Sequence, residues 1–346
     1  MLSENLLMSL CIKHAWSFQT LTFPNPSVGA MVVDERGEIL ALEAHQKCGG
    51  PHAEVLALKT AYFKLTKDTR ILPLEDSASL HDFLTQNHGG IFSKCNIFVT
   101  LEPCSCFGKT PPCAKLLAAI KPQKVLIGAL ESTQNSGGKA LLESHHIPTQ
   151  SGLLEQECLE LLLPFSLHHK QRRFTLFKLA CRLDGDYKSG VISAQDSRIF
   201  THNQRSVATT LILSGNTLQN DDPLLDARFA TPPYDSSHKP DILILTRQRN
   251  TLPRTLRIFQ NQRNIQITDQ IPTLPQGFNI IEGGWGLFHA LREQIDMLAL
   301  HLSPSLATPS PAVSTAPHFQ HPQNFRGKLL HTAKLGEDSL SWIQNF

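Results

Sequence analysis

One histidine and two cysteines in the first half of the chain are of the residue types that zinc prefers as ligands. His52 and Glu54 belong to the sequence HAE, while Cys104 and Cys113 end the sequences LEPC and PPC. Three such ligands leave the fourth tetrahedral position of zinc open for water, as in catalytic zinc sites. Glu54 is not needed as a ligand and can exchange protons beside the metal. The pattern predicts a catalytic site with one zinc ion per chain.

This set of residues is typical of zinc-dependent nucleobase deaminases, in which a glutamate that does not bind the metal acts as acid and base. Zinc lowers the pKa of its water, so that hydroxide can attack an amino-bearing ring carbon near neutral pH. Glu54 would take the proton of the water and deliver it to the departing ammonia.

Simpler explanations exist for each part of the pattern. In HAE alone, His52 could cap a helix, and free cysteines are often small core residues. LEPC and PPC after an apolar run favour a metal site. Cys106 could replace either cysteine ligand, although a Cys-x-Cys chelate is cramped. We interpret His45 and Cys48 as loop or pocket-wall residues, because a fourth protein ligand would exclude water. We expect the other cysteines to be structural: Cys11, Cys95, Cys158 and Cys181.

An alternation of apolar β-rich runs and helix-like segments must position these residues. In the first half it reads SVGAMVV, HAEVLALKTAYFKL, NIFVTL, CAKLLAAI and KVLIGAL. Such alternation predicts an α/β layered domain with a parallel or mixed sheet. A second alternation starts at Phe174, after a boundary segment at 150–172 that contains a proline and a basic run. We therefore predict a zinc-dependent deaminase domain at 1–150 and a second α/β domain at 170–346.

Composition fits two globular domains in a chain of 346 residues, with 41% hydrophobic and 18% charged residues. A formal charge of +2 argues against a broad nucleic-acid surface. Neither a signal peptide nor an apolar run of about 20 residues is present, so no membrane partner is expected. The cysteines cluster around one motif, which favours metal use in a reducing cytoplasm. The segment Ser303 to Pro322 is rich in Pro, Ser, Thr and His and is expected to be a long loop.

Three motifs resemble the bifunctional deaminase/reductase family of riboflavin biosynthesis: PNPSVGAMVV (24–33), HxxxGxxHAE (45–54) and TLEPCSCFGKTPPCA (100–114). The long gap between the two cysteines is the more specific feature, because nucleoside and transfer-RNA deaminases generally show a tight PCxxC. The second half follows the order of the family's reductase half, with KLACRLDG (178–185), SGNTLQNDDPLLDAR (214–228), IIEGG (280–284) and LGED (335–338).

The resemblance implies a cytidine-deaminase-like three-layer domain followed by a dihydrofolate-reductase-like α/β domain. It implies two successive steps on one small phosphorylated pyrimidine, 2,5-diamino-6-(ribosylamino)pyrimidin-4-one 5′-phosphate. The first step replaces the 2-amino group by oxygen, and the second uses NADPH to reduce the ribosyl group to ribityl. Zinc and NADPH are the cofactors that it implies, and we expect a homo-oligomer.

Site residues are implied at the positions that match the family motifs. Contacts to NADPH are expected from Ala180, Thr217, Asp221, Gly284, Trp285, Gly286, Leu287, Phe288, His289 and Ala290. Substrate contacts are expected from Asn25, Lys109, Ser189, Arg205, Leu225, Arg228 and Glu282. Arginines such as Arg205 and Arg228 can hold a phosphate with two parallel hydrogen bonds. An amide such as that of Asn25 can donate to and accept from a pyrimidine edge.

The sequence departs from the family pattern at four places. Cys106 stands where the family usually has His, and Val191 where it commonly has Trp. The segment 60–95 suggests an inserted loop or hairpin. The region 250–278 looks too short for a full strand and helix pair.

These departures leave an alternative in which only the deaminase is active and the second half is a binding or dimerisation module. That alternative predicts ammonia release without NADPH oxidation. A transfer-RNA deaminase would be expected to show PCxxC, and a structural zinc domain would have a fourth protein ligand.

Overall fold

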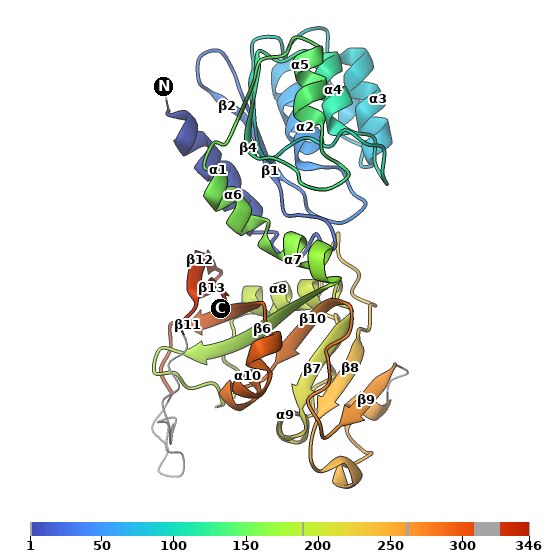
Figure 1. Ribbon diagram of the computed structural model, residues 1–346, viewed down its shortest axis with the longest axis vertical. Coiled ribbons are helices and arrows are strands. Elements are labelled where there is room, and N and C mark those ends of the chain that lie inside the picture. Colours follow the sequence, from blue (N-terminus) through green and yellow to red (C-terminus); the bar gives the residue numbers. More distant parts are fainter. Residues whose placement is uncertain (1, 189, 261–262, 308–325, 346) are drawn as a thin grey trace. The chain divides into compact units, whose positions relative to one another are not determined.

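A computed structural model describes residues 2–188, 190–260, 263–307 and 326–345 (Figure 1). The chain forms two compact units, Met1–Phe165 and Ser166–Phe346. Ser189 and most of the expected loop before Pro322 lie outside the described residues. Within the described ranges, no helix has the length and apolar character needed to cross a membrane.

The N-terminal unit is built on a five-stranded sheet with the order β2-β1-β3-β4-β5. Its strands are β1 (Gly29–Val33), β2 (Ile39–Ala44), β3 (Asn96–Leu101), β4 (Lys124–Ala129) and β5 (Thr149–Ser151). Strand β1 pairs antiparallel with β2 and β3, whereas β3, β4 and β5 are parallel. All five residues of β1 are buried, as expected for an apolar strand that is covered on both faces.

Helices cover both faces of this sheet (Figure 1). Helices α1 (Glu4–Trp16) and α6 (Glu155–Leu161) pack on one face. The other face carries α2 (Ala53–Thr66), α3 (Ser77–Asn87), α4 (Cys113–Ile120) and α5 (Gly138–Ser144). A short 3-10 turn, η1 (Thr69–Ile71), follows α2, and α7 (Leu163–Gln171) leads out of the unit. The result is a three-layer α/β arrangement.

The segment 60–95 is not the loop or hairpin that we expected. Helix α2 continues to Thr66, and α3 follows and packs against α2 and α4. Asp76 caps α3 by accepting a hydrogen bond from the Ser79 amide. Leu80 and Leu84 lie one turn apart and are fully buried, so the extra chain is anchored in the core.

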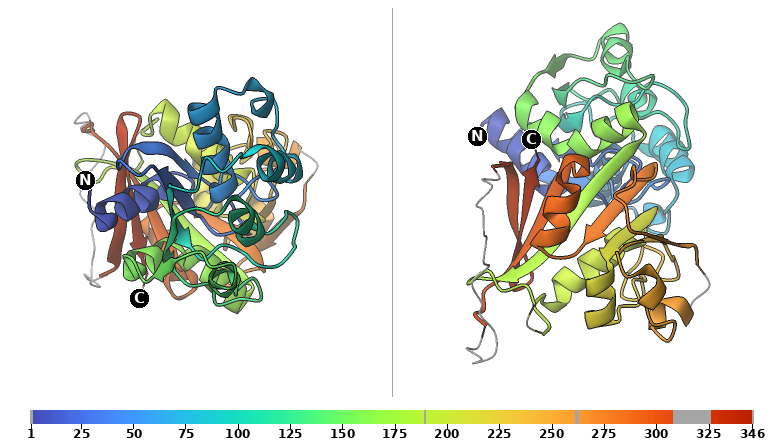
Figure 2. Two further views of the ribbon diagram at one scale, coloured as in Figure 1. Left: turned by 90° about the horizontal axis from the view of Figure 1, so that it is seen from above. Right: turned by 60° about the horizontal axis from the view of Figure 1, so that its bottom comes forward.

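The C-terminal unit is built on an eight-stranded sheet with the order β12-β13-β11-β6-β10-β7-β8-β9 (Figure 2). Its strands are β6 (Arg173–Arg182), β7 (Thr210–Ser214), β8 (Asp241–Leu245), β9 (Ile265–Thr268), β10 (Gly277–Glu282), β11 (Met297–Ser303), β12 (Lys328–Leu335) and β13 (Asp338–Gln344). The six strands from β11 to β9 are parallel, and β13 pairs antiparallel with β11 and β12.

Side chains alternate between the two faces of this sheet. Phe177 of β6 packs against Phe288 of α10 (Trp285–Leu291), which lies in front of the sheet in the right view of Figure 2. The opposite face packs against α8 (Gln195–Arg205). There the ring centroids of Phe200 and Trp342 are 6.3 Å apart. The remaining elements are α9 (Gly215–Asp221) and the 3-10 turns η2 (Arg249–Thr251), η3 (Arg257–Gln260) and η4 (Arg292–Gln294).

The described part of 250–278 holds 3-10 turns, strand β9 and the start of β10, but no α-helix. This fits the prediction that the region is too short for a strand and helix pair.

Candidate functional site

The three predicted zinc ligands converge at the ends of α2, β3 and α4. His52 is the N-cap residue of α2, and Cys113 is the first residue of α4. Cys104 lies in the loop that follows β3. One donor atom from each of the three residues lies within 4.8 Å of the other two, and they form the one such group of His, Cys, Asp and Glu among the described residues.

The spacing of these atoms fits a tetrahedral zinc ion. Nδ1 of His52 lies 3.6 Å from Sγ of Cys104 and 3.4 Å from Sγ of Cys113. Tetrahedral zinc with ordinary Zn–S and Zn–N bond lengths requires nitrogen and sulfur ligands about 3.5 Å apart. One imidazole and two thiols therefore suit zinc in both chemistry and distance.

The local backbone favours the thiolate form of Cys104, whereas its hydrogen bond to Cys104 and burial raise the pKa of Cys113. The amide of Cys113, at the start of α4, donates a hydrogen bond to Sγ of Cys104 at 3.3 Å. Helix N-termini favour negative charge. A hydrogen bond from the Cys113 thiol lowers the pKa of Cys104 to about 4, and His52 adds to this shift while burial opposes it.

Thr110 is a residue of this site that the sequence analysis did not single out. Its Oγ1 lies 3.2 Å from Nε2 of His52, the ring nitrogen opposite the one that faces the sulfurs. Such a partner fixes the ring orientation and tautomer of a metal-binding histidine. The hydroxyl within GKTPPC, between the two cysteines, was the available signal.

Glu54 lies in the first turn of α2 and is 4% exposed. Burial raises the pKa of Glu54 to about 7, and Cys104 adds to the shift while His52 opposes it. A carboxyl group with such a pKa can both take and return a proton at neutral pH.

The zinc group opens into a cavity of about 250 Å³ that is also lined by Asn25, His45, Cys48 and Lys109. Nδ2 of Asn25 lies 3.1 Å from Nε2 of His45, whose Nδ1 lies 3.0 Å from the carbonyl oxygen of Pro51. Burial lowers the pKa of His45 to about 4. His45 is therefore neutral at pH 7 and orients the amide of Asn25. Lys109 is exposed, with its Nζ 3.9 Å from Sγ of Cys48.

Glu102 also lines the cavity and holds the chain segment beside it. Its two carboxylate oxygens accept hydrogen bonds from the backbone amides of Glu131, Gly137 and Lys139 at 2.8–3.2 Å. The sequence analysis did not identify this role, because the three donors come from a distant segment that runs into the start of α5. Cys106 is exposed beside that segment and donates to the carbonyl oxygen of Gln134.

In the C-terminal unit, three neighbouring strands bring together the ends of the reductase motifs. Strands β6, β10 and β7 are adjacent and parallel, so their carboxyl ends lie at the same edge of the sheet. Ala180 lies near that end of β6, and Gly284 follows β10. Thr217 and Asp221 are one turn apart on α9, which follows β7.

Two glycines lie at the start of α10, where contacts to NADPH are expected, and the ring of Tyr187 packs against one of them, Gly284. Gly284 is the N-cap residue of α10 in extended conformation, and a Cβ atom built on Gly286 would have nothing within 4 Å. Not all of the predicted stretch can face a ligand: Phe288 is fully buried against the core, and Trp285 and Leu287 pack against the same cluster. The Phe288 side chain is therefore structural, whereas the expected contacts of Gly284 and Gly286 to NADPH stay a prediction.

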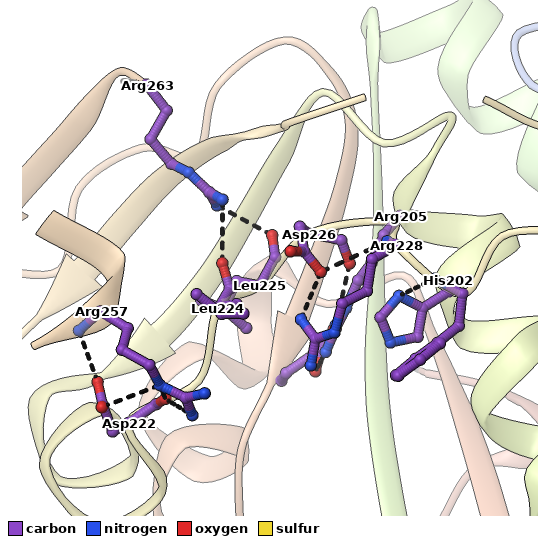
Figure 3. A network of polar contacts seen from close by, with 11 residues as sticks. His202, Arg205, Asp222, Leu224, Leu225, Asp226, Arg228, Arg257 and Arg263 are labelled. Carbon is purple, nitrogen blue, oxygen red and sulfur yellow. Dashed lines mark hydrogen bonds and ion pairs between the residues drawn. The ribbon is translucent and has the colours of Figure 1, made fainter. Parts of the chain in front are cut away.

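Two of the predicted substrate contacts are bonded to each other. Nε and Nη2 of Arg205 donate to the two carboxylate oxygens of Glu282 at 2.7 and 2.6 Å. Arg228 forms a 2.6 Å ion pair with Asp226 (Figure 3). The Arg205 fork that we expected to hold a phosphate is thus engaged by a buried carboxylate.

Comparisons with known proteins agree with these observations. Residues 1–129 match the family described as the cytidine and deoxycytidylate deaminase zinc-binding region. The riboflavin biosynthesis protein RibD of Mycobacterium tuberculosis is 29% identical over 276 residues, which cover 77% of this chain and 72% of that protein. RibD of Aquifex aeolicus is 33% identical over 230 residues, which cover 64% of this chain and 57% of that protein.

Solved structures share the fold over both units. Acinetobacter baumannii RibD matches with a TM-score of 0.62 and 24% identity, covering 99% of this chain and 98% of that chain. A diaminohydroxyphosphoribosylaminopyrimidine deaminase/5-amino-6-(5-phosphoribosylamino)uracil reductase from Thermotoga maritima has a TM-score of 0.62 and 23% identity with the same coverage. The predicted fold class, a cytidine-deaminase-like domain followed by a reductase domain, is confirmed.

The match to the mycobacterial protein extends over 276 residues and so cannot be contained in an N-terminal unit that ends at Phe165. This argues against the deaminase-only alternative. With a zinc-type donor set in the first unit and a reductase-like sheet in the second, the chain is similar over both units to the RibD proteins of riboflavin biosynthesis.

Proposed function

We propose that the N-terminal unit removes the 2-amino group of 2,5-diamino-6-(ribosylamino)pyrimidin-4-one 5′-phosphate and that the C-terminal unit then reduces the ribosyl group to ribityl. The observation that supports this most is the His52, Cys104 and Cys113 donor set beside a cavity that His52, Cys104 and the buried Glu54 line. The proposal retains the predicted homo-oligomer, the cytoplasmic location and the absence of nucleic-acid and membrane partners.

In the first step, water supplies the oxygen that replaces the amino group, which leaves as ammonia. Zinc held by His52 and the two cysteines would activate that water. Glu54 takes a proton from the water and returns it to the leaving nitrogen, a role for which its pKa of about 7 is suited. Asn25, oriented by His45, would bind the pyrimidine edge, and Lys109 at the open side would meet the anionic part of the substrate.

For the second step, bound NADPH would supply the hydride that reduces the sugar, and a proton from solvent would complete the reduction. Ala180, Thr217, Asp221 and the backbone from Gly284 to Ala290 would hold NADPH at the carboxyl edge of the sheet. Leu225 and Arg228 would contact the substrate. Because Arg205 and Glu282 bind each other, we assign to them the shaping of the substrate site rather than a free phosphate fork.

The test gives the purified full chain, loaded with zinc, the diaminopyrimidinone phosphate with and without NADPH. Ammonia release and absorbance at the nicotinamide band are followed separately. We expect ammonia in both mixtures and NADPH oxidation that follows ammonia release. Ammonia release without NADPH oxidation would support the deaminase-only alternative, and no ammonia release would refute the proposal.

A further inference from the structure

The loop at 222–229, between α9 and β8, contains backbone conformations that must be stabilised by contacts with the rest of the unit. Asp222 and Leu225 both adopt left-handed conformations, with φ of 39° and 51°. Residues other than glycine rarely adopt this region, and they persist there only where the surroundings hold them. The loop also carries Leu225 and Arg228, two of the expected substrate contacts.

Three arginines from separate elements donate to main-chain carbonyl groups of this loop (Figure 3). Arg257, in η3, donates through Nε to the carbonyl oxygen of Asp222 at 3.0 Å and also pairs with its carboxylate. Arg205, at the end of α8, donates to the carbonyl oxygen of Asp226 at 3.3 Å. The third arginine, Arg263, lies just before β9.

Arg263 spans two consecutive carbonyl groups with one guanidinium group. Its Nη1 donates to Leu225 at 2.9 Å and its Nη2 to Leu224 at 3.0 Å. Such a planar fork fixes both position and orientation, and a charged donor makes each hydrogen bond stronger than a neutral one. Its Nε is buried and has no hydrogen-bond partner within the described residues. Unlike Arg205 and Arg257, Arg263 thus makes its described hydrogen bonds to the loop backbone alone.

The far end of the loop is anchored to α8. The amide of Phe229 donates to Nδ1 of His202 at 3.4 Å, and the amide of Thr231 donates to Oδ1 of Asn203 at 2.9 Å. With this end fixed by α8 and the start fixed by Arg257, the middle of the loop is held by Arg205 at Asp226 and by Arg263 at Leu224 and Leu225. The middle is where Leu225 adopts its left-handed conformation.

We propose that Arg263 is a positioning residue of the reductase step. Its guanidinium group holds Leu224 and Leu225 in the backbone conformation that presents Leu225 and Arg228 to the phosphorylated substrate. It acts through the loop and does not itself touch the substrate. The assignment of Leu225 and Arg228 as substrate contacts rests on the proposed function.

The experiment compares full-length Arg263→Ala and Arg263→Lys with the wild type and with Arg249→Ala, a control at an exposed arginine of the same region. The reductase step is assayed with the deaminated pyrimidine phosphate and NADPH. We expect Arg263→Ala to raise the KM for the pyrimidine about tenfold and to change kcat less than about twofold, since ground-state and transition-state binding are lost together. The KM of Arg263→Lys should lie between those of the wild type and Arg263→Ala, because one ammonium group reaches one carbonyl at a time.

Hydrogen exchange of the amides at 222–229 gives a readout that does not depend on activity. Both Arg263 variants should exchange faster there, while Arg249→Ala, the rest of the sheet and the rate of deamination stay at wild-type values. A merely structural role would lower kcat and the amount of folded protein without a selective rise in KM, and that result would overturn the proposal. The proposal would also be overturned if both Arg263 variants kept the KM and the loop hydrogen exchange of the wild type. A wild-type chain that oxidises no NADPH is recognised before any variant is made and refutes the proposed function instead.

Discussion

Nε2 of His52 and Oγ1 of Thr110 lie 3.2 Å apart, so the imidazole nitrogen that faces away from the cysteines has a hydroxyl partner. When Nδ1 binds zinc, Nε2 would carry the hydrogen and donate it to Thr110. Partners of this kind keep a metal-binding ring in one orientation and one tautomer.

Thr110→Val is therefore expected to weaken zinc binding about tenfold, because the isosteric side chain leaves the ring without its partner. Competition with a zinc chelator measures the change. Thr110→Ser keeps the hydroxyl and serves as the control. Equal zinc affinity in the valine and serine variants would show that the contact does not support the metal.

Glu54→Gln is expected to retain zinc and to lose deamination by at least about a hundredfold, because the amide cannot take or return a proton. Zinc content and ammonia release are measured on the same preparation. Reduction of the deaminated pyrimidine, in the other unit, should stay unchanged. Deamination that survives the substitution would exclude Glu54 as the proton carrier.

Glu282→Gln is expected to destabilise the C-terminal unit by about 3 kcal/mol, because it leaves the largely buried Arg205 without its negative partner. Urea unfolding in a Trp16→Phe background, followed by the fluorescence of the remaining Trp285 and Trp342, reports on this unit. Replacing both partners, by Arg205→Met with Glu282→Leu, should recover part of the loss. An unfolding midpoint equal to the wild type in Glu282→Gln would contradict the importance of the pair.

Because of His301, we expect the stability of the C-terminal unit to decrease at acidic pH. Burial lowers its pKa to about 3, and Lys178 adds to this shift while Glu282 opposes it. Because the folded pKa lies below the unfolded value of about 6.5, the contribution of His301 to stability is present above pH 6.5 and is lost as the pH falls toward 3. Both ring nitrogens lack a hydrogen-bond partner among the described residues.

When the pH falls from 7.5 to 5.5, the free energy of unfolding should therefore decrease by about 1 kcal/mol less in His301→Phe than in the wild type. Urea unfolding at the two pH values, again in the Trp16→Phe background and followed through Trp285 and Trp342, measures the difference. Identical pH dependence in the two proteins would mean that His301 accepts a proton in the folded state.

The sequence predicted the parts of the site that are encoded locally. His52 and Glu54 are two residues apart, and Cys104 and Cys113 stand beside prolines, so residue type and spacing were sufficient to identify them. Thr110 was missed because its role depends on where the His52 ring lies across the cavity. The role of Glu102 likewise depends on amides of a segment that is distant in the chain.

The fold class could also be predicted, whereas individual segments could not. The i, i+4 spacing of Leu80 and Leu84 behind Asp76 is a helix signal, yet a long gap between two motifs favoured a loop or hairpin. Arg205 and Glu282 were each assigned to the substrate because neither sequence position reveals the other as its partner. Their pairing arises from the packing of α8 on the sheet next to β10.

All zinc-binding side chains and Glu54 come from residues 52–113, inside a unit that ends at Phe165. A ribosome therefore delivers the full ligand set before it has translated most of the second half. Since domains generally fold in order during synthesis, the nascent chain can load its metal while the hydride-transfer half has yet to be made.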